Sequence, residues 1–253
     1  MKSDNMRFYS AMLMAGCGLQ SAAQTQRPNI VFIITDDHSF QTISAYGSEV
    51  SKLAPTPNID RLANEGARFD DAFVENSLST PARACLLTGL YSHQNGQRTL
   101  GKGIDSTKTF VSELLQDAGY QTGVVGKWHM QCRPKGFDFF RIFEGQGDYY
   151  NPLVLSHDSN GKYEREQGYA TDIVTEHAVE FLNQRDEQKP FFLLVEHKAP
   201  HRTWMPNLKY LGLYDKVEFP LPTSFWDDYA TRGTCASQQE MTIARHIQLA
   251  YDN

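Results

Sequence analysis

Three runs of apolar residues, separated by amphipathic stretches, dominate the hydrophobic pattern of the chain. The run over residues 29–35 is continuously β-branched or aromatic, which predicts a strand buried on both faces. Residues 120–125 and 191–195 predict two further strands. Apolar residues recur at helical spacing over 107–118 and 171–183. This alternation of strand and helix predicts a layered α/β fold with a largely parallel sheet.

Each of the three predicted strands ends in a cluster of ionisable residues. In chain order the clusters are Asp36-Asp37-His38, Gly126-Lys127-Trp128-His129 and Glu196-His197-Lys198-Ala199-Pro200-His201. Parallel strands place their carboxyl ends at one edge of a sheet, and α/β folds bind ligands beyond that edge. One such ending would carry little weight, but three of them predict a ligand site.

A fourth candidate lies in a predicted helix over residues 76–89. Ser79 or Thr80 has the residue type of an N-cap, and Gly89 suits the C-terminal end. Free N–H groups and the helix dipole make such a start a site for an anion, and Arg83 lies one turn further along. A plain cap and a surface arginine are the commoner use of this pattern, so both interpretations stay open.

Composition narrows the class of protein. The chain has 253 residues, of which 40% are hydrophobic and 21% charged, with a formal net charge of −6. Such a chain can bury a sizeable core, which excludes disordered, collagen-like and polytopic membrane proteins. The acidic balance argues against nucleic-acid binding, which relies on clustered Lys and Arg. The four cysteines contain no C-x-x-C pair, so they predict neither a disulfide scaffold nor a thiolate zinc site.

The first two dozen residues have the pattern of an export signal. Basic residues precede an apolar stretch over 8–19, which is shorter than the roughly 20 residues of a membrane span. Cleavage at 21–23 and lipidation of Cys17 in a lipobox-like sequence are both open, and so is a misplaced start codon. We expect residues 1–24 to be a signal peptide, and the protein to be periplasmic or an outer-surface lipoprotein anchored at Cys17.

Together these segments resemble the type I sulfatases of the alkaline phosphatase-like superfamily. The family signature is Cys or Ser, any residue, Pro, Ser or Ala, then Arg, with a Thr-Gly pair a few positions later. The matching segments are Pro28-Asn29-Ile30 before Asp36-Asp37, Thr56 to Ala63, Ser79-Thr80-Pro81-Ala82-Arg83 with Thr88-Gly89, Gly126 to His129, and His197 to His201. The resemblance covers residues 27–253 and implies a three-layer α/β/α fold with a largely parallel central sheet.

A narrower resemblance points to the bacterial N-acetylglucosamine-6-sulfatases of the serine type, which act on mucin-type or other host glycans. It rests on Asp37-His38 with residues 43–47, and on the segment from His197 through Tyr229. The resemblance implies that a maturation enzyme oxidises Ser79 to formylglycine, whose hydrate is a stronger nucleophile than serine. The substrate implied is a sulfated glycan, with 6-O-sulfated N-acetylglucosamine as the sugar.

The resemblance also implies a metal site. Asp36, Asp37 and the side chain of residue 79 would bind one divalent cation, by family habit Ca²⁺, for which carboxylate oxygens are suitable ligands. The metal ion would also help to hold the hydrate and to spread negative charge away from the sulfate oxygens in the transition state.

The remaining implied roles concern charge and protons. Arg83 and Lys127 would hold the hydrate and spread negative charge in the transition state. Lys198 and His201 would contact the sulfate, with His201 donating a proton to the leaving sugar oxygen. His129 would take a proton from the remaining hydroxyl so that sulfate is released.

The chain departs from the family pattern towards its C-terminus. We expect residues 25–253 to be the N-terminal part of the catalytic domain, without the second metal-ligand pair and the small C-terminal domain of these sulfatases. Asp252-Asn253 resembles such a pair, but Ser237 and Glu240 at capping-box spacing predict a helix running to the chain end. Ca²⁺ needs six to eight oxygen ligands, so three predicted ligands are too few, and a short chain of low activity is expected.

Two other functions stay open on these residues. A phosphatase or phosphodiesterase of the same superfamily would use unmodified Ser79 or Thr80 beside two zinc ions. A non-catalytic exported fragment would bind a sulfated glycan without releasing product. The spacing of Pro81 and Arg83, which the formylglycine-generating enzyme is thought to read, favours the sulfatase.

Overall fold

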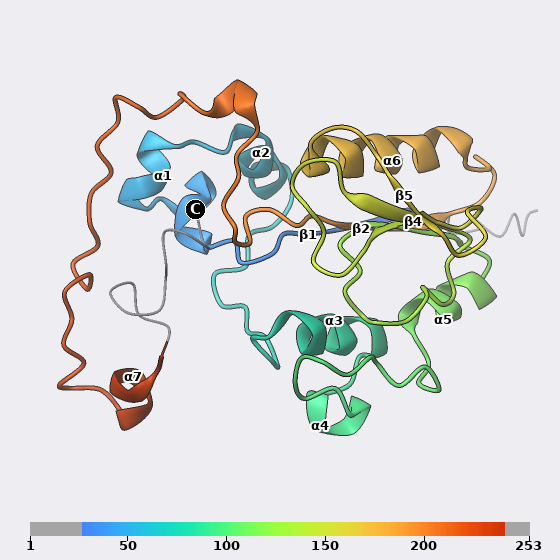
Figure 1. The fold of residues 1–253 in the computed structure, drawn as a ribbon, viewed down its shortest axis with the longest axis horizontal. Coiled ribbons are helices and arrows are strands. Elements are labelled where there is room, and N and C mark those ends of the chain that lie inside the picture. The colour runs from blue at the N-terminus through green and yellow to red at the C-terminus, as the bar shows by residue number, and fades with distance from the viewer. Residues whose placement is uncertain (1–26, 241–253) are drawn as a thin grey trace, which may run out of the picture.

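The computed structural model describes residues 27–240, which form a six-stranded sheet with helices on both faces. The strands are β1 (Ile30–Ile34), β2 (Gln121–Gly126), β3 (Phe139–Phe143), β4 (Leu153–Ser156), β5 (Tyr163–Arg165) and β6 (Phe191–Glu196). The helices are α1 (Glu49–Leu53), α2 (Pro57–Glu65), α3 (Ser79–Thr88), α4 (Ser92–Asn95), α5 (Val111–Asp117), α6 (Ala170–Gln184) and α7 (Thr234–Gln238). Short 3₁₀ helices span Phe40–Thr42, Ser44–Tyr46 and Leu208–Tyr210. Figure 1 shows α6 on one face of the sheet and α3 and α5 on the other, which confirms the predicted three-layer α/β/α fold.

The strand order is β1-β6-β2-β3-β4-β5, and the first four of these strands are parallel. The antiparallel strands β4 and β5 extend the sheet beyond β3. In the register of the parallel strands, Ile34 and Gly126 both lie opposite Glu196. The three clusters that follow β1, β2 and β6 therefore meet at one edge of the sheet, as the sequence predicted.

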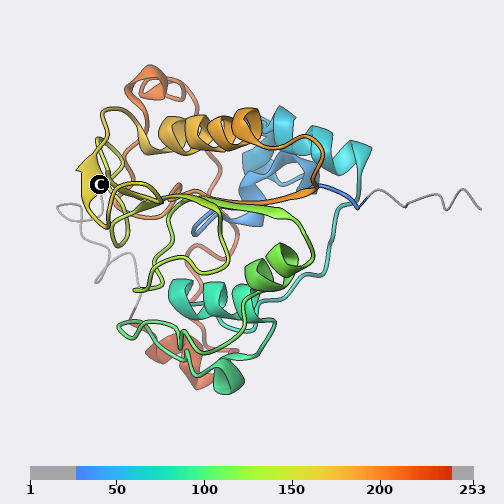
Figure 2. The ribbon, with the colours of Figure 1, turned by 90° about the vertical axis from the view of Figure 1, so that its right-hand side faces the viewer.

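One hydrophobic cluster fixes α6 on its face of the sheet. Val174, Ala178 and Phe181 of this helix are buried against β-strand residues that include Val125 and Leu193. The view in Figure 2 shows the helix lying along the sheet. The predicted helix over 171–183 is thus confirmed, because its apolar stripe at helical spacing is the buried face.

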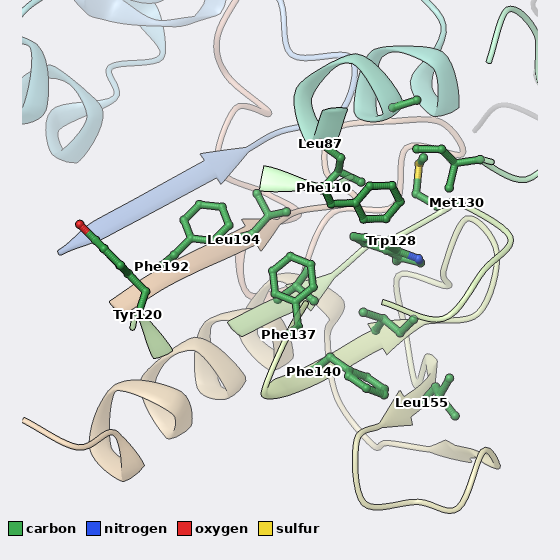
Figure 3. Packing of buried hydrophobic residues seen from close by; sticks show 14 residues of the cluster. Leu87, Phe110, Tyr120, Trp128, Met130, Phe137, Phe140, Leu155, Phe192 and Leu194 are labelled. Carbon is green, nitrogen blue, oxygen red and sulfur yellow. The ribbon is translucent and has the colours of Figure 1, made fainter. Parts of the chain in front are cut away.

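The cluster on the opposite face carries α3 and therefore the residue at its start. Figure 3 shows Leu87 of α3 packed near Phe110 and Leu194, with Trp128 beside Met130. All five side chains are buried. Since burial of each large apolar side chain contributes about 1.5–3 kcal/mol, this cluster holds α3 firmly against the sheet.

Strand β1 corrects the prediction of a strand buried on both faces. Val31 is 48% exposed and Ile33 is 55% exposed. Within the described part of the chain β1 pairs with β6 on one side and forms the edge of the sheet. A continuous apolar run is typical of a strand in a parallel sheet, and it does not reveal how much of the strand its neighbours cover.

Two helix starts also differ from the prediction. Helix α5 begins at Val111 instead of residue 107, because Asp105 accepts a hydrogen bond from the Thr107 amide (3.0 Å) in a preceding turn. Ser237 lies inside α7 and its hydroxyl donates to the Thr234 carbonyl (3.1 Å), so the predicted capping box with Glu240 is wrong. The sequence predictions did not include strands β3, β4 and β5.

Some sequence predictions fall outside the described residues. They are the signal peptide over 1–24 with Cys17, and the Asp252-Asn253 pair. Among residues 27–240, the structure contains no helix that is both long enough and apolar enough to cross a membrane.

Candidate active site

Helix α3 presents residue 79 at its first position. The N-cap is Leu78, whose side chain cannot cap the helix, so the predicted capping role of Ser79 or Thr80 is wrong. Both side chains have other partners. The Ser79 hydroxyl accepts a hydrogen bond from Arg83 Nε (3.3 Å), and Thr80 Oγ1 donates to the carbonyl of His129 (3.1 Å). Without a side-chain cap, the first-turn amides remain available to an anion.

Arg83 of α3 is buried, and its guanidinium contacts residues at the ends of β1, β2 and β6. Its side chain is 4% exposed, which excludes the surface-arginine interpretation. Nη1 donates to the Lys127 carbonyl (2.5 Å) and to Glu196 Oε1 (2.9 Å). Nη2 lies 3.5 Å from Asp36 Oδ2. The guanidinium is therefore held in one orientation, with Nε directed at Ser79.

Lys127 places a second cation at the same point. The residue is fully buried, and its ammonium bonds Asp36 Oδ2. Burial lowers the pKa of Lys127, the carboxylate of Asp36 raises it again, and the positive charges of Arg83 and Lys198 lower it further. The site thus concentrates positive charge beside residue 79, with Asp36 between two of the cations.

A close backbone approach joins the ends of β2 and β6. Gly126 has φ +99°, and a Cβ there would lie 2.0 Å from the Glu196 carbonyl oxygen. The same oxygen accepts a hydrogen bond from the Lys127 amide (2.7 Å). Only glycine fits this contact, because any side chain would overlap backbone atoms. This close contact between the two backbones fixes the position of Lys127, which directly follows β2.

Glu196 is a site residue for which no sequence pattern predicted a role. Its side chain is 2% exposed and its Oε2 has no hydrogen-bond partner in the described structure. Burial raises the pKa of Glu196 to about 7, although the Arg83 guanidinium acts in the opposite direction. A carboxylate behind Arg83 balances part of the positive charge and orients the guanidinium.

His129 lies at the end of β2 with Thr80 against it. Its backbone has φ +49°, and its Nδ1 lies 3.4 Å from Thr80 Oγ1. Burial lowers the pKa of His129 to about 4, with Lys127 and Arg83 adding to the effect. The imidazole is therefore uncharged at neutral pH and can accept a proton.

Asp37, Lys198 and His201 complete the cluster. Asp37 has φ +59°, and its Oδ2 lies 3.6 Å from His201 Nε2. Lys198 is buried, which lowers the pKa of its ammonium. The hydroxyl of Tyr149, to which the sequence analysis assigned no role, donates to the His201 carbonyl (2.6 Å). No sequence pattern marks Tyr149, because it lies in a loop far from the motifs.

A cavity of about 470 Å³ opens beside the end of β1 and the start of α3, and its lining does not include Lys127, His129, Lys198 or His201. Asp36, Asp37, Ser79 and Arg83 contribute to its lining, together with His38. Its volume falls within the range of small-molecule sites, roughly 300–1,000 Å³. The structure therefore brings the predicted residues of β1 and α3 together around a space that fits a small anionic ligand.

Comparison with known proteins identifies the family. The family model described as "Sulfatase" matches residues 28–250. The chain belongs to the sulfatase family. It is 44% identical over 246 residues to the N-acetylglucosamine-6-O-sulfatase of Bacteroides thetaiotaomicron, which covers 96% of this chain and 43% of the relative. It is 30% identical over 220 residues to mouse arylsulfatase J, which covers 77% of this chain and 36% of the relative.

Solved structures agree with the family assignment. The structure of BT4656 in complex with its substrate D-glucosamine-2-N,6-O-disulfate matches with a TM-score of 0.85 and 46% identity, over 90% of this chain and 45% of that chain. The predicted family and the predicted fold, that of the alkaline phosphatase-like superfamily, are thus confirmed. The chain spans less than half the length of the relatives named here.

Sulfatases generally depend on Ca²⁺, and the residues at this site show part of what such an ion needs. Asp36 and Asp37 supply the hard oxygen atoms that Ca²⁺ prefers, and Ser79 lines the same cavity. Asp36 Oδ2 is already paired with Lys127 and Arg83. Over residues 27–240 no group of three or more His, Cys, Asp or Glu side chains could hold a metal ion. The donor chemistry fits, but the described residues alone do not complete a Ca²⁺ site.

Proposed function

We propose that the protein is a sulfuric ester hydrolase that removes sulfate from a sulfated glycan, with 6-O-sulfated N-acetylglucosamine as the sugar. The observation that carries the proposal is the position of Ser79, at the open start of α3 and within 3.3 Å of the buried Arg83. The negatively charged sulfate ester finds cations and free helix amides there. The 44% identity to an N-acetylglucosamine-6-O-sulfatase supports the choice of sugar.

Residue 79 supplies the nucleophile in this proposal. A serine hydroxyl is weak, and we propose that a maturation enzyme oxidises Ser79 to formylglycine, whose hydrate carries two hydroxyls on one carbon. The sequence from Ser79 to Arg83 has the spacing on which the family signature depends. A divalent cation would add positive charge at residue 79, with Asp36 and Asp37 contributing part of its ligands.

Arg83 and Lys127 stabilise negative charge as the sulfur–oxygen bond breaks. Both side chains are buried, so water screens their charges weakly and the electrostatic effect on a bound sulfate is large. Their orientation is set in advance, since Arg83 is fixed by Glu196 and Lys127 by Asp36. Catalysis therefore requires little rearrangement of these groups.

His201 and His129 serve as acid and base. His201 lies beside Asp37, with 3.6 Å between Nε2 and Oδ2, and it donates a proton to the leaving sugar oxygen. His129 is uncharged at neutral pH and takes a proton from residue 79 so that sulfate is released. Lys198 binds the sulfate from the side of β6. These are the roles that the sequence resemblance implies for the three residues.

Sulfate release tests the proposal. The protein is incubated with N-acetylglucosamine-6-sulfate and with N-acetylglucosamine-6-phosphate, and both anions are measured by ion chromatography. We expect sulfate release that EDTA abolishes and Ca²⁺ restores. Faster phosphate release that depends on zinc would replace the proposal with the phosphatase. Binding of the sulfated sugar without release would identify a glycan-binding protein.

We also propose that the protein is exported. The support is the sequence alone: basic residues, then the short apolar stretch over 8–19, then either a small-residue cleavage site at 21–23 or lipidation of Cys17. Mass spectrometry of the mature N-terminus checks this. A chain that still begins at Met1 in a cytosolic fraction would contradict export, and a diacylglyceryl group on Cys17 would identify the lipoprotein.

A further inference from the structure

Tyr149 lies between two of the proposed sulfate-site residues. Its hydroxyl donates to the His201 carbonyl (2.6 Å), and its ring faces the Lys198 ammonium, 4.9 Å from Nζ to the ring centroid. The residue is 4% exposed and belongs to the loop between β3 and β4. One side chain from outside the sulfatase motifs therefore contacts both residues.

Two neighbouring tyrosines hold Tyr149 and the segment that follows His201. The rings of Tyr149 and Tyr169 are stacked with centroids 5.9 Å apart, and Tyr150 meets Tyr169 edge-on at 5.2 Å. The Tyr169 hydroxyl donates to the Met205 carbonyl (3.0 Å), and the Tyr150 hydroxyl donates to the Pro206 carbonyl (2.9 Å). We call Tyr149, Tyr150 and Tyr169 the tyrosine cluster. It binds the backbone of residues 201–206 at three points.

The ring of Tyr149 suits an ammonium that has to remain charged. Lys198 is buried, and burial lowers its pKa, whereas the carboxylates of Asp36 and Asp148 raise it. An aromatic face attracts a cation through its quadrupole and brings no negative charge that would compete with a sulfate. The hydroxyl acts separately on the main chain of His201, whose amide also donates to the Lys198 carbonyl (3.0 Å).

We propose that Tyr149 is a positioning residue for desulfation, with its ring holding Lys198 and its hydroxyl holding His201. The inference rests on the proposed function, because that function gives Lys198 the sulfate and His201 the leaving oxygen. The two parts of one side chain then support two different roles, sulfate binding and protonation of the leaving oxygen. Substitutions that remove one part or both separate these roles.

Comparing kcat for substrates with different leaving groups tests the role of the Tyr149 hydroxyl. Tyr149→Phe keeps the ring and loses the hydrogen bond to His201, so kcat for N-acetylglucosamine-6-sulfate falls about tenfold. For 4-nitrophenyl sulfate, whose leaving group needs little protonation, kcat falls less than about twofold. Tyr149→Leu removes the ring as well and slows both substrates about 100-fold. A purely structural role would lower both rates equally in Tyr149→Phe, and that result would overturn the positioning role of the hydroxyl.

Tyr150→Phe is the matched control, because it loses a hydroxyl of the same kind whose hydrogen-bond partners are Pro206 and Leu208 instead of His201. It keeps both rates. Amide hydrogen exchange over residues 198–203 gives a readout that needs no turnover: Tyr149→Phe accelerates exchange there, and Tyr150→Phe does not. If Tyr149→Phe changes neither amide hydrogen exchange over residues 198–203 nor kcat, the positioning role of Tyr149 is overturned and the proposed function is not affected. An unsubstituted protein that desulfates neither substrate overturns the proposed function, and the exchange data then still decide whether Tyr149 holds the segment.

Discussion

The substitution Glu196→Gln tests how the buried carboxyl beside Arg83 makes the stability of the fold depend on pH. The Glu196 carboxyl is 2% exposed, and burial raises its pKa from 4.5 to about 7. A pKa difference of one corresponds to about 1.4 kcal/mol, so the whole difference corresponds to about 3 kcal/mol. Because the carboxyl is almost fully buried, solvent screening does not reduce this value appreciably.

The sign follows from proton binding in the two states. Below pH 4.5 both the folded and the unfolded chain hold the Glu196 proton, and the stabilisation of the protonated form is complete. Between pH 4.5 and about 7 only the folded chain holds it, so the free energy of unfolding falls as the pH rises. Above about pH 7 the contribution is lost. Glu196→Gln removes the ionisable group and therefore this slope.

Urea denaturation between pH 4 and 8 measures the effect, with fluorescence of the buried Trp128 as the signal. We expect the stability of Glu196→Gln relative to the unsubstituted chain to rise by about 3 kcal/mol from pH 4 to pH 8. Glu187→Gln is the matched control, since Glu187 is exposed, and its relative stability stays constant. Parallel pH profiles for Glu196→Gln and the unsubstituted chain would refute the reasoning.

Three further predictions follow from the site geometry. Gly126→Ala destabilises the fold by more than about 4 kcal/mol, because the added Cβ would overlap the Glu196 carbonyl. Gly47→Ala is the control and costs about 1–2 kcal/mol, because Gly47 has φ +74° but open space around it. Equal midpoints of urea denaturation for the two variants would contradict this prediction. His129 titrates near pH 4 in an NMR experiment, and a midpoint near 6.5 would contradict the combined effect of burial and of the neighbouring cations on its pKa. Arg83→Lys keeps the positive charge but loses the forked contacts to Glu196 and Lys127. The rate of sulfate release therefore falls at least about 100-fold, while the circular dichroism spectrum is unchanged. Release at the original rate would show that Arg83 does not stabilise charge in the transition state.

The sequence predicted the elements that carry the chemistry because their signals are local. Strands β2 and β6 follow from short apolar runs, and the apolar stripe of α6 matches its buried face. The ends of parallel strands lie at one edge of a sheet, so the convergence of Asp36, Lys127 and Lys198 also followed from the pattern.

What the sequence did not predict depends on contacts between distant segments. Glu196 resembles the last residue of any strand until the fold places it 2.9 Å from Arg83. Tyr149 carries no motif, and its contact with His201 depends on the loop between β3 and β4 reaching the segment that follows β6. The sequence pattern left Ser79 or Thr80 open as the N-cap because serine and threonine favour that position, but Leu78 is the N-cap residue and the Ser79 hydroxyl accepts a hydrogen bond from Arg83.

Mass spectrometry of the peptide that contains Ser79 tests the central claim most directly. The protein is produced in a host that carries a serine-type maturation enzyme, and the peptide is compared with that of Ser79→Ala. The account predicts a Ser79 peptide lighter by two hydrogens, which identifies the aldehyde, in a preparation that releases sulfate. An intact serine in a preparation that releases sulfate at full rate would contradict it.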